Sequence, residues 1–470
     1  MTSRRSFARA VTRRAAVVVF SAAFVLSLPG CGEIGNSTAP VRQSAADGSS
    51  ANSDANPRSD RPATASRDRR PRKNPESVDE EFRARPLKQL SPQQLDEGWV
   101  ELFDGQTLFG WESANPSVNW RVEDGAIVAE AGGPGLLTTF VACADFELQC
   151  DVRLERGGNS GIFLRTPARP RNPSVDCYEW NLCDSHDAFP TASLVGRRAV
   201  HGVRIEDDRW HTCRIRFQGP HLKAWIDGRL VTDFREAAQS AGFLRRGFIG
   251  LQQNRGRVAF RRIFLKPLGT RPLLPEHGLE GWRIVPGSRS RFSIEDGTLA
   301  IDGGPGYLQT KGRWADFALQ LEAFVDGARL NSGVFFRALA GTQDAPANGY
   351  EVQIHNGFYD GDRSRPVDAG TGAIFRRTVA RWVVPDDRQW FHLTLIAVGD
   401  RFGVWVEGFP VTMWQDGRPD DPNPRRGRRL QSGHLILQGH DPTTHVRFRR
   451  MRIADWSVPE SAVGAQRRND

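Results

Sequence analysis

Apolar and polar residues alternate along much of this chain with a period of two. Between residues 145 and 155, one side of an extended strand would carry Phe146, Leu148, Cys150, Val152 and Leu154, with charged and amide residues between them. The same alternation returns at Phe317, Leu319, Leu321, Ala323 and Val325. Short alternating segments separated by Gly-rich turns predict antiparallel strands. Because the sequence shows no convincing amphipathic helix, we predict an all-β protein.

The chain also repeats itself. Five motifs recur in the same order 171 or 172 residues later: Val122–Gly125 and Ile294–Gly297, Gly132–Gly135 and Gly303–Gly306, Asp145-Phe146 and Asp316-Phe317, Asn159–Gly161 and Asn331–Gly333, Tyr178-Glu179 and Tyr350-Glu351. A solenoid repeat would be only ~20–50 residues long, so this is a duplicated domain. Each copy has the length of a two-sheet jelly roll. We predict one domain at 97–268 and a second at 272–457.

The N-terminal segment, residues 1–31, predicts an export signal. A basic stretch containing Arg4 and Arg5 precedes an uncharged apolar run from Ala15 to Leu28. The arginine pair resembles a twin-arginine signal, and Leu28-Pro-Gly-Cys31 resembles a lipobox in which Cys31 is lipid-modified. Plain signal cleavage, with Cys31 incidental, is the alternative. We expect an exported protein of the cell envelope, periplasmic or surface, held to a membrane through Cys31.

Residues 32–96 contain almost no large apolar side chains, which predicts a disordered tether, and 458–470 a disordered tail. The formal net charge of +9 does not indicate a nucleic-acid partner, because the arginines are scattered and no recognition motif accompanies them. Beyond Cys31, the five remaining cysteines all fall in the first copy, at Cys143, Cys150, Cys177, Cys183 and Cys213. Since the second copy has none, the fold does not require disulfides.

Two polar clusters recur at matching places in the copies. In a strand, Glu179, Asn181 and Cys183 share one face, as do Glu351, Gln353 and His355, and apolar residues occupy the opposite face. A carboxylate, an amide and an imidazole in a row can bind a polyol, ligate a metal or supply a base. The structural alternative is an ordinary strand and an Asn-Ser-Gly turn. The sequence contains no serine or cysteine nucleophile motif, phosphate loop or His-Glu-x-x-His pattern.

The ordered set of motifs, from Leu102-Phe-Asp-Gly105 through the repeated pairs above to Phe448-Arg-Arg450, resembles the 3-keto-disaccharide hydrolase family, also described as 3-keto-glucoside 1,2-lyase and 3-keto-2-hydroxyglucal hydratase. The resemblance covers both copies and implies a concanavalin-like jelly-roll fold. It also implies a chemistry: a ketone at C3 acidifies the C2 proton, a base removes it, and the enolate expels the C1 substituent by β-elimination before water adds.

The resemblance implies site residues as well. The expected catalytic residues are Glu351 and His355 in the second copy and Glu179 and His186 in the first. The expected substrate contacts are Asn331, Arg337 and Gln353 in the second copy, and Asn159, Arg165, Asn181 and Asp184 in the first. A divalent metal ion is a natural enolate stabiliser, with Glu351 and His355 as candidate ligands. His186 lies three positions beyond Cys183, the position that aligns with His355, so the copies do not present identical sets.

Two other functions stay open. A non-catalytic glycan-binding lipoprotein is one, since the same sandwich serves lectins and tryptophans such as Trp180, Trp225, Trp382 and Trp405 can stack on sugar rings. A protein in which one copy is purely structural is the other. In each of the enzymatic and binding cases the partner is a carbohydrate.

Overall fold

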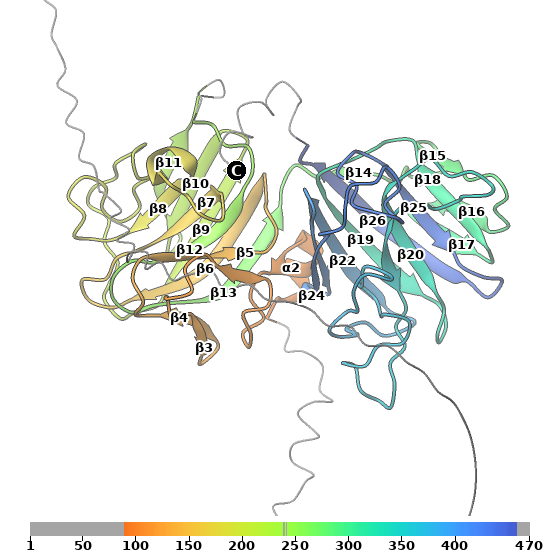
Figure 1. Ribbon diagram of the computed structural model, residues 1–470, viewed down its shortest axis with the longest axis horizontal. Coiled ribbons are helices and arrows are strands. Elements are labelled where there is room, and N and C mark those ends of the chain that lie inside the picture. The colour runs from red at the N-terminus through yellow and green to blue at the C-terminus, as the bar shows by residue number, and fades with distance from the viewer. Residues whose placement is uncertain (1–88, 238–239, 241, 458–470) are drawn as a thin grey trace, which may run out of the picture. The chain divides into compact units, whose positions relative to one another are not determined.

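The computed structural model describes residues 89–237, 240 and 242–457, and the regular secondary structure of these residues is almost entirely antiparallel strand (Figure 1). The strands form four sheets, two from each copy of the repeat. The prediction of two tandem all-β jelly-roll sandwiches is confirmed. The predicted signal segment with Cys31, most of the tether and the tail lie outside the described residues, so export and membrane anchoring stay predictions.

The first sandwich pairs a large sheet with a small one. The eight-stranded sheet has the order β11-β10-β9-β6-β13-β4-β3, with β1 also paired to β13. Its strands are β1 (Val100–Glu101), β3 (Arg121–Glu123), β4 (Ala126–Ala129), β6 (Phe146–Leu154), β9 (His211–Gln218), β10 (His221–Ile226), β11 (Arg229–Arg235) and β13 (Val258–Pro267). The five-stranded sheet, order β2-β5-β12-β7-β8, consists of β2 (Trp111–Ser113), β5 (Gly135–Thr139), β7 (Ser160–Thr166), β8 (Tyr178–Leu182) and β12 (Phe248–Gln253).

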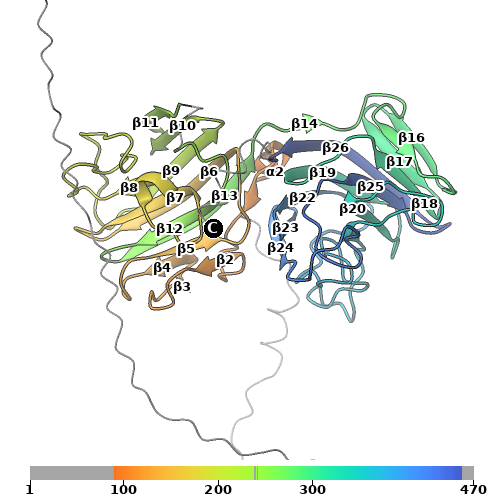
Figure 2. The same ribbon diagram turned by 45° about the horizontal axis from the view of Figure 1, so that its top comes forward.

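The second sandwich repeats this plan strand for strand. Its eight-stranded sheet has the order β16-β17-β26-β19-β22-β23-β24, with β14 also paired to β26. The strands are β14 (Arg271–Pro272), β16 (Arg291–Glu295), β17 (Thr298–Asp302), β19 (Phe317–Val325), β22 (Trp390–Val398), β23 (Arg401–Val406), β24 (Phe409–Gln415) and β26 (His445–Asp455). The five-stranded sheet, order β15-β18-β25-β20-β21, consists of β15 (Trp282–Ile284), β18 (Gly306–Thr310), β20 (Ser332–Ala338), β21 (Tyr350–Ile354) and β25 (His434–Gly439). Figure 2 shows the small sheet of each sandwich lying across the large one.

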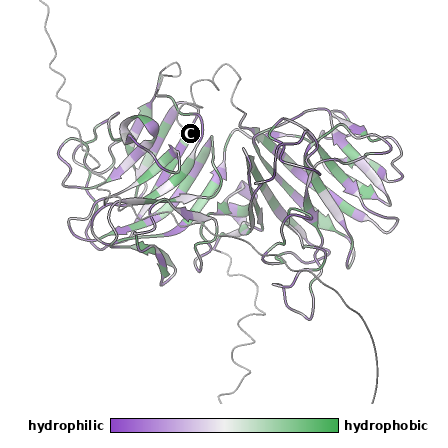
Figure 3. Ribbon diagram, in the orientation of Figure 1, coloured by the Kyte–Doolittle hydropathy of each residue, from purple (hydrophilic) through white to green (hydrophobic). Residues whose placement is uncertain are grey.

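The alternation in the sequence decides which side of each strand enters the core. Hydrophobic and hydrophilic positions alternate along the strands in Figure 3. The apolar set of β6 and the matching set of β19 are buried between the sheets. The polar side of β6 is not simply solvated, however, because Glu147 and Asp151 are buried there too, beside Arg214 and Arg261. Such ion pairs let a carboxylate be buried at a tolerable cost.

The described residues also contain two short helices, α2 (Pro92–Glu97) and α3 (Pro173–Asp176). The first lies within the segment predicted to be disordered, so that prediction is wrong for residues 92–96. The reason is local: Ser91 and Gln94 form a capping box, and Leu95 packs in a cluster with Leu90, Trp99 and Phe264. Neither helix is long or apolar enough to span a bilayer, and this holds for every helix in the described part of the chain.

All five cysteines of the first sandwich are buried, and Cys143, Cys150, Cys183 and Cys213 are free thiols. Several of the tryptophans considered as sugar platforms are core residues: Trp180 and Trp405 are fully buried. Trp225 and Trp382 are half-buried. The sandwich therefore uses most of its tryptophans for packing.

Candidate functional site

The end strand β21 of the five-stranded sheet carries the predicted row of polar residues. Tyr350, Val352 and Ile354 point into the core, so the alternation puts Glu351 and Gln353, and His355 just beyond the strand, on the outer face. These three side chains are nevertheless buried, with 5%, 1% and 5% exposure. The row is therefore recessed rather than displayed on the surface.

The neighbouring strand β20 provides the floor beneath this row. Phe335 lies opposite Glu351, and Gly333 opposite Gln353. A Cβ atom on Gly333 would lie only 2.6 Å from Oε1 of Glu351. The glycine of the Asn331–Gly333 motif thus leaves space for the carboxylate, which explains the residue better than a turn does.

A pocket of about 250 Å³ opens beside Glu351. Its other walls are the segment Ile374–Arg377, Pro424 and Arg425. Arg425 places a cation at this pocket, with its Nη2 3.6 Å from Oε2 of Glu351. Burial raises the pKa of Glu351 to about 7, and the attraction of Arg425 offsets this only in part. A carboxylate with a pKa near neutrality is suited to take up and release a proton.

The other end of the row is held by Asp368. Its Oδ2 accepts hydrogen bonds from Asn331 Nδ2 at 2.6 Å and from Gln353 Nε2 at 2.8 Å. The structure therefore brings together two of the predicted substrate contacts, Asn331 and Gln353. Both donate a hydrogen bond to Asp368, a carboxylate that the sequence analysis did not single out.

His355 lies next to this group. Its Nδ1 accepts a hydrogen bond from the Gly357 N–H at 3.2 Å, which places the proton of a neutral ring on Nε2. Burial lowers the pKa of His355, so the neutral ring is favoured. Glu351 and His355 are four positions apart, so their Cα atoms would lie about 13 Å apart in an extended segment with a rise of ~3.3 Å per residue. Asp368 interacts electrostatically with both side chains, and the assignment of Glu351 and His355 as ligands of one metal ion stays a prediction.

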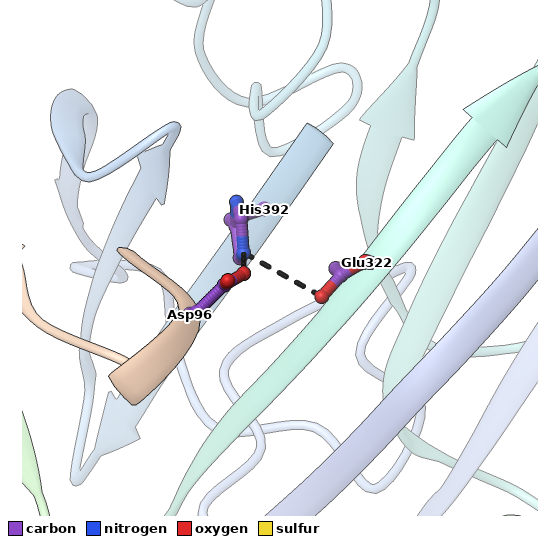
Figure 4. A group of neighbouring side chains, drawn as sticks. All are labelled: Asp96, Glu322 and His392. Carbon is purple, nitrogen blue, oxygen red and sulfur yellow. Dashed lines mark hydrogen bonds and ion pairs between the residues drawn. The ribbon is translucent and has the colours of Figure 1, made fainter. Parts of the chain in front are cut away.

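Within the described residues, one group of three side chains has its ligand atoms close enough for a metal: Asp96, Glu322 and His392 (Figure 4). Arg450 Nη1 already lies 3.0 Å from Asp96 and 2.9 Å from Glu322, and Arg449 binds Glu322 at 2.6 Å. Burial opposes a charge on His392, but Glu407, Glu322 and Asp96 together raise its pKa. The group is thus an ion-pair network joining α2 to β19 and β22.

In the first sandwich, Glu179 and Asn181 lie on the outer face of β8 just as their counterparts lie on β21. Burial raises the pKa of Glu179 to about 7, and a 3.3 Å hydrogen bond from Gln252 Nε2 lowers it only in part. Asn181 donates to the carbonyl of Phe189. Asn159 is half-buried, and its backbone pairs with that of Arg255.

Two further residues of the first copy do not join this row. His186 is exposed and its Nδ1 accepts from the Phe189 N–H at 3.0 Å, while Asp184 is exposed and accepts from Thr191. No hydrogen bond or ion pair of the described residues links either one to Glu179. The role of His186 as a catalytic partner therefore has no geometric support.

The two predicted substrate arginines need correction. Arg165 and Arg337 are buried, with 1% and 0% exposure. Each guanidinium donates to three backbone carbonyls and to the aspartate at the start of a neighbouring strand, Asp145 or Asp316. These hydrogen bonds hold the end of a strand to the surrounding loops. The sequence could not show this, because an arginine at the end of a strand is equally compatible with a solvent-exposed contact to a ligand.

The site thus contains residues that the motifs did not reveal, chiefly Arg425 and Asp368. A signal was present in the sequence: the difference in residue number between matching residues of the two copies grows along the chain, which marks insertions in the second copy. It is 172 for Asp184 and Asn356, 180 for Thr191 and Thr371, and 186 for Leu251 and Leu437. Both residues come from the longer loops of the second copy.

These observations define a class: a tandem jelly-roll protein with a recessed carboxylate and an arginine-lined pocket on the outer face of a small sheet. Nothing in that arrangement resembles a nucleophile triad, and the polar row suits a small polyhydroxy ligand. The chain belongs to the 3-keto-α-glucoside-1,2-lyase-like domain family, whose model matches residues 98–266 and 269–454. It is accordingly a carbohydrate-active, hydrolase-like protein, and the family predicted from the motifs is confirmed.

Individual relatives are more distant. A 3-keto-disaccharide hydrolase from Bacteroides thetaiotaomicron is 35% identical over 79 residues, which cover 14% of this chain and 27% of that relative. A solved structure from Parabacteroides distasonis, described as a proposed glycosyl hydrolase, is 19% identical with a TM-score of 0.35 and covers 39% of this chain and all of that one. A carbohydrate-binding module, CBM66 from Bacillus subtilis, is 16% identical with a TM-score of 0.27, covering 33% and 95%. No residue role follows from these likenesses.

Proposed function

We propose that the second sandwich cleaves 3-keto glycosides by β-elimination, with Glu351 as the base that removes the C2 proton. The observation that carries the proposal is Glu351 itself, a buried carboxylate whose pKa is raised to about 7 at the wall of a pocket lined by arginines. A base is most effective when its pKa lies near the working pH.

The electron flow is simple. The Glu351 carboxylate takes the C2 proton, and the C2–H electron pair forms an enolate with the C3 ketone. The enolate then forms the C1–C2 double bond while the C1–O bond breaks and the aglycone oxygen leaves with its electron pair. The aglycone leaves as an alcohol once it has gained one proton, which balances the proton that Glu351 accepted. Addition of water across the C1–C2 double bond gives the free 3-keto sugar.

The developing negative charge on the C3 oxygen needs a cation that is in place before reaction. Arg425, at 3.6 Å from Glu351, and Arg376 on the same pocket wall are positioned for that charge. Gln353, Asn331 and Asp368 form a hydrogen-bonded row suited to orienting hydroxyl groups. No step of this proposal is assigned to a metal ion.

The test compares two chromogenic glucosides with the same aglycone, one carrying a 3-keto group and one not, on the purified full chain. We expect release from the keto compound alone, rising as the pH is raised through about 7 because Glu351 must be ionised. Glu351→Gln should reduce release by about 10²–10⁴-fold, the usual contribution of a positioned base.

Glu295→Gln is the matched control, since it removes the same charge from an exposed glutamate of the same sandwich. It should behave like the unmodified protein. Saturable binding of the keto compound without release by the unmodified protein would refute cleavage and favour a glycan-binding role. Equal release by Glu351→Gln would refute the assignment of the base.

A further inference from the structure

The two outer faces can be compared residue by residue, because the same hydrogen bonds recur in both. Asn181 N–H donates to Ser193 O and Gln353 N–H to Ala373 O, each at 2.9 Å. Thr191 Oγ1 donates to Asp184 and Thr371 Oγ1 to Asn356, at 2.5 and 2.6 Å. The loop between the strand and this threonine is therefore eight residues longer in the second sandwich, since the separation between matching residues rises from 172 to 180.

That longer loop contains Asp368, which organises Asn331 and Gln353. A second loop, between Thr412 and Leu437, is six residues longer than its counterpart between Thr232 and Leu251, and it supplies Arg425. The first sandwich also has Cys183 where the second has His355. Asp368, Arg425 and His355 thus have no charged counterpart in the first copy.

The first sandwich offers Glu179 no replacement for Arg425. Arg197, which matches Arg377, is taken up by Glu236 and by the carbonyl oxygens of Cys177 and Gly242. Among the described residues, no arginine or lysine forms an ion pair with Glu179, whose side chain accepts a hydrogen bond from the neutral amide of Gln252. An enolate formed there would lack a cation, so the elimination would have no electrostatic stabilisation.

A second set of features is common to both copies. Each has a buried glutamate with a pKa near 7, a glycine on the adjacent strand, and a glutamine on the next one, Gln252 or Gln438. The Oε1 atom of each glutamine is buried and accepts no hydrogen bond. Buried acceptors are rarely left unpaired in native proteins. Because these atoms have almost no accessible surface, a sugar hydroxyl could donate to either one only once a neighbouring side chain has moved aside.

We propose that the two sandwiches divide the work: the first binds the sugar at Glu179 and Gln252 without cleaving it, and cleavage takes place only in the second. The inference rests on the proposed function, because it assigns the same substrate class to a second site. The duplication would then give one chain with a single catalytic centre and a second site that binds the same sugar without cleaving it.

The test uses the full-length chain and the chromogenic aryl 3-keto-glucoside. Glu351→Gln should lower aglycone release below about 1% of the unmodified protein although Glu179 is intact. Calorimetric titration of Glu351→Gln with the same compound should give two equivalents bound, and Glu351→Gln combined with Gln252→Leu should give one. Gly161→Val, which fills the space between Glu179 and Gln252, is the second variant if Gln252→Leu does not fold.

The outcomes separate the two proposals. No release by the unmodified protein refutes the proposed function itself. Release by the unmodified protein that persists at about half its rate in Glu351→Gln shows cleavage in the first sandwich and overturns the division of work. One equivalent bound by Glu351→Gln, unchanged by Gln252→Leu or Gly161→Val, shows that the first sandwich does not bind the sugar.

Discussion

Gly333 gives the sharpest test of how the carboxylate is positioned. In Gly333→Ala the new Cβ would lie 2.6 Å from Glu351 Oε1, whereas ordinary van der Waals contact begins at 3.4 Å. The clash involves the end of a flexible side chain, so the glutamate is expected to move by roughly 0.8 Å, the difference between these distances, while the strand stays in place. A misplacement of about 1 Å at a reacting group can cost about 10²-fold in rate. We therefore expect kcat/KM to fall by about 10²-fold with little loss of stability.

The displacement should also leave a signature in the pH profile. Burial raises the pKa of Glu351 to about 7, so a carboxylate pushed toward solvent should have a lower pKa. The acidic limb of the kcat/KM profile should then move to lower pH. Aglycone release measured from pH 5 to 9, together with a thermal unfolding curve, gives both quantities.

Gly417→Ala is the control for this prediction, because a Cβ there meets no atom within 4 Å and the residue has no positive φ. It should leave rate, pH profile and unfolding temperature unchanged. If Gly333→Ala kept the original kcat/KM and the original acidic limb, the carboxylate would not be positioned by the space over Gly333.

Two further predictions concern stability. The folded-state pKa of Glu351 lies above its ordinary value of 4.5, so its favourable contribution to stability is complete below about pH 4.5 and is lost as the pH rises through about 7. Glu351→Gln should therefore raise the free energy of unfolding at pH 8.5, by at most about 3 kcal/mol at ~1.36 kcal/mol per pKa unit, and should bring no gain at pH 4. Equal denaturation midpoints for the two proteins at pH 8.5 would contradict this prediction. Arg337→Met should lower the free energy of unfolding by about 3–5 kcal/mol, because it removes one partner of a buried ion pair with Asp316 and leaves three carbonyl oxygens without their hydrogen-bond donor. A loss below about 1 kcal/mol in a urea titration would show that Arg337 does not hold the strand end in place.

The sequence by itself determined the architecture. The period-two alternation in β6 and β19 requires strands with one buried face, and the ordered repeat requires two copies of one fold, because these patterns depend on local geometry and on the burial of apolar surface. The same alternation placed Glu351, Gln353 and His355 on one face of one strand. The helix α2 was missed because a six-residue helix is stabilised by its cap and by Phe264, more than 160 residues away in the chain.

Only the tertiary structure decided what surrounds that face. Arg337, which the motif suggested as a ligand contact, turned inward to bind carbonyl oxygens, while Arg425 and Asp368 arrived from loops with no motif of their own. Their contribution depends on the path of two loops that are longer in the second copy than in the first. The local sequence pattern does not determine where these loops lie against the sheet. The raised pKa of Glu351 is likewise a property of burial by segments far apart in the chain, so the sequence could name the carboxylate but not its environment.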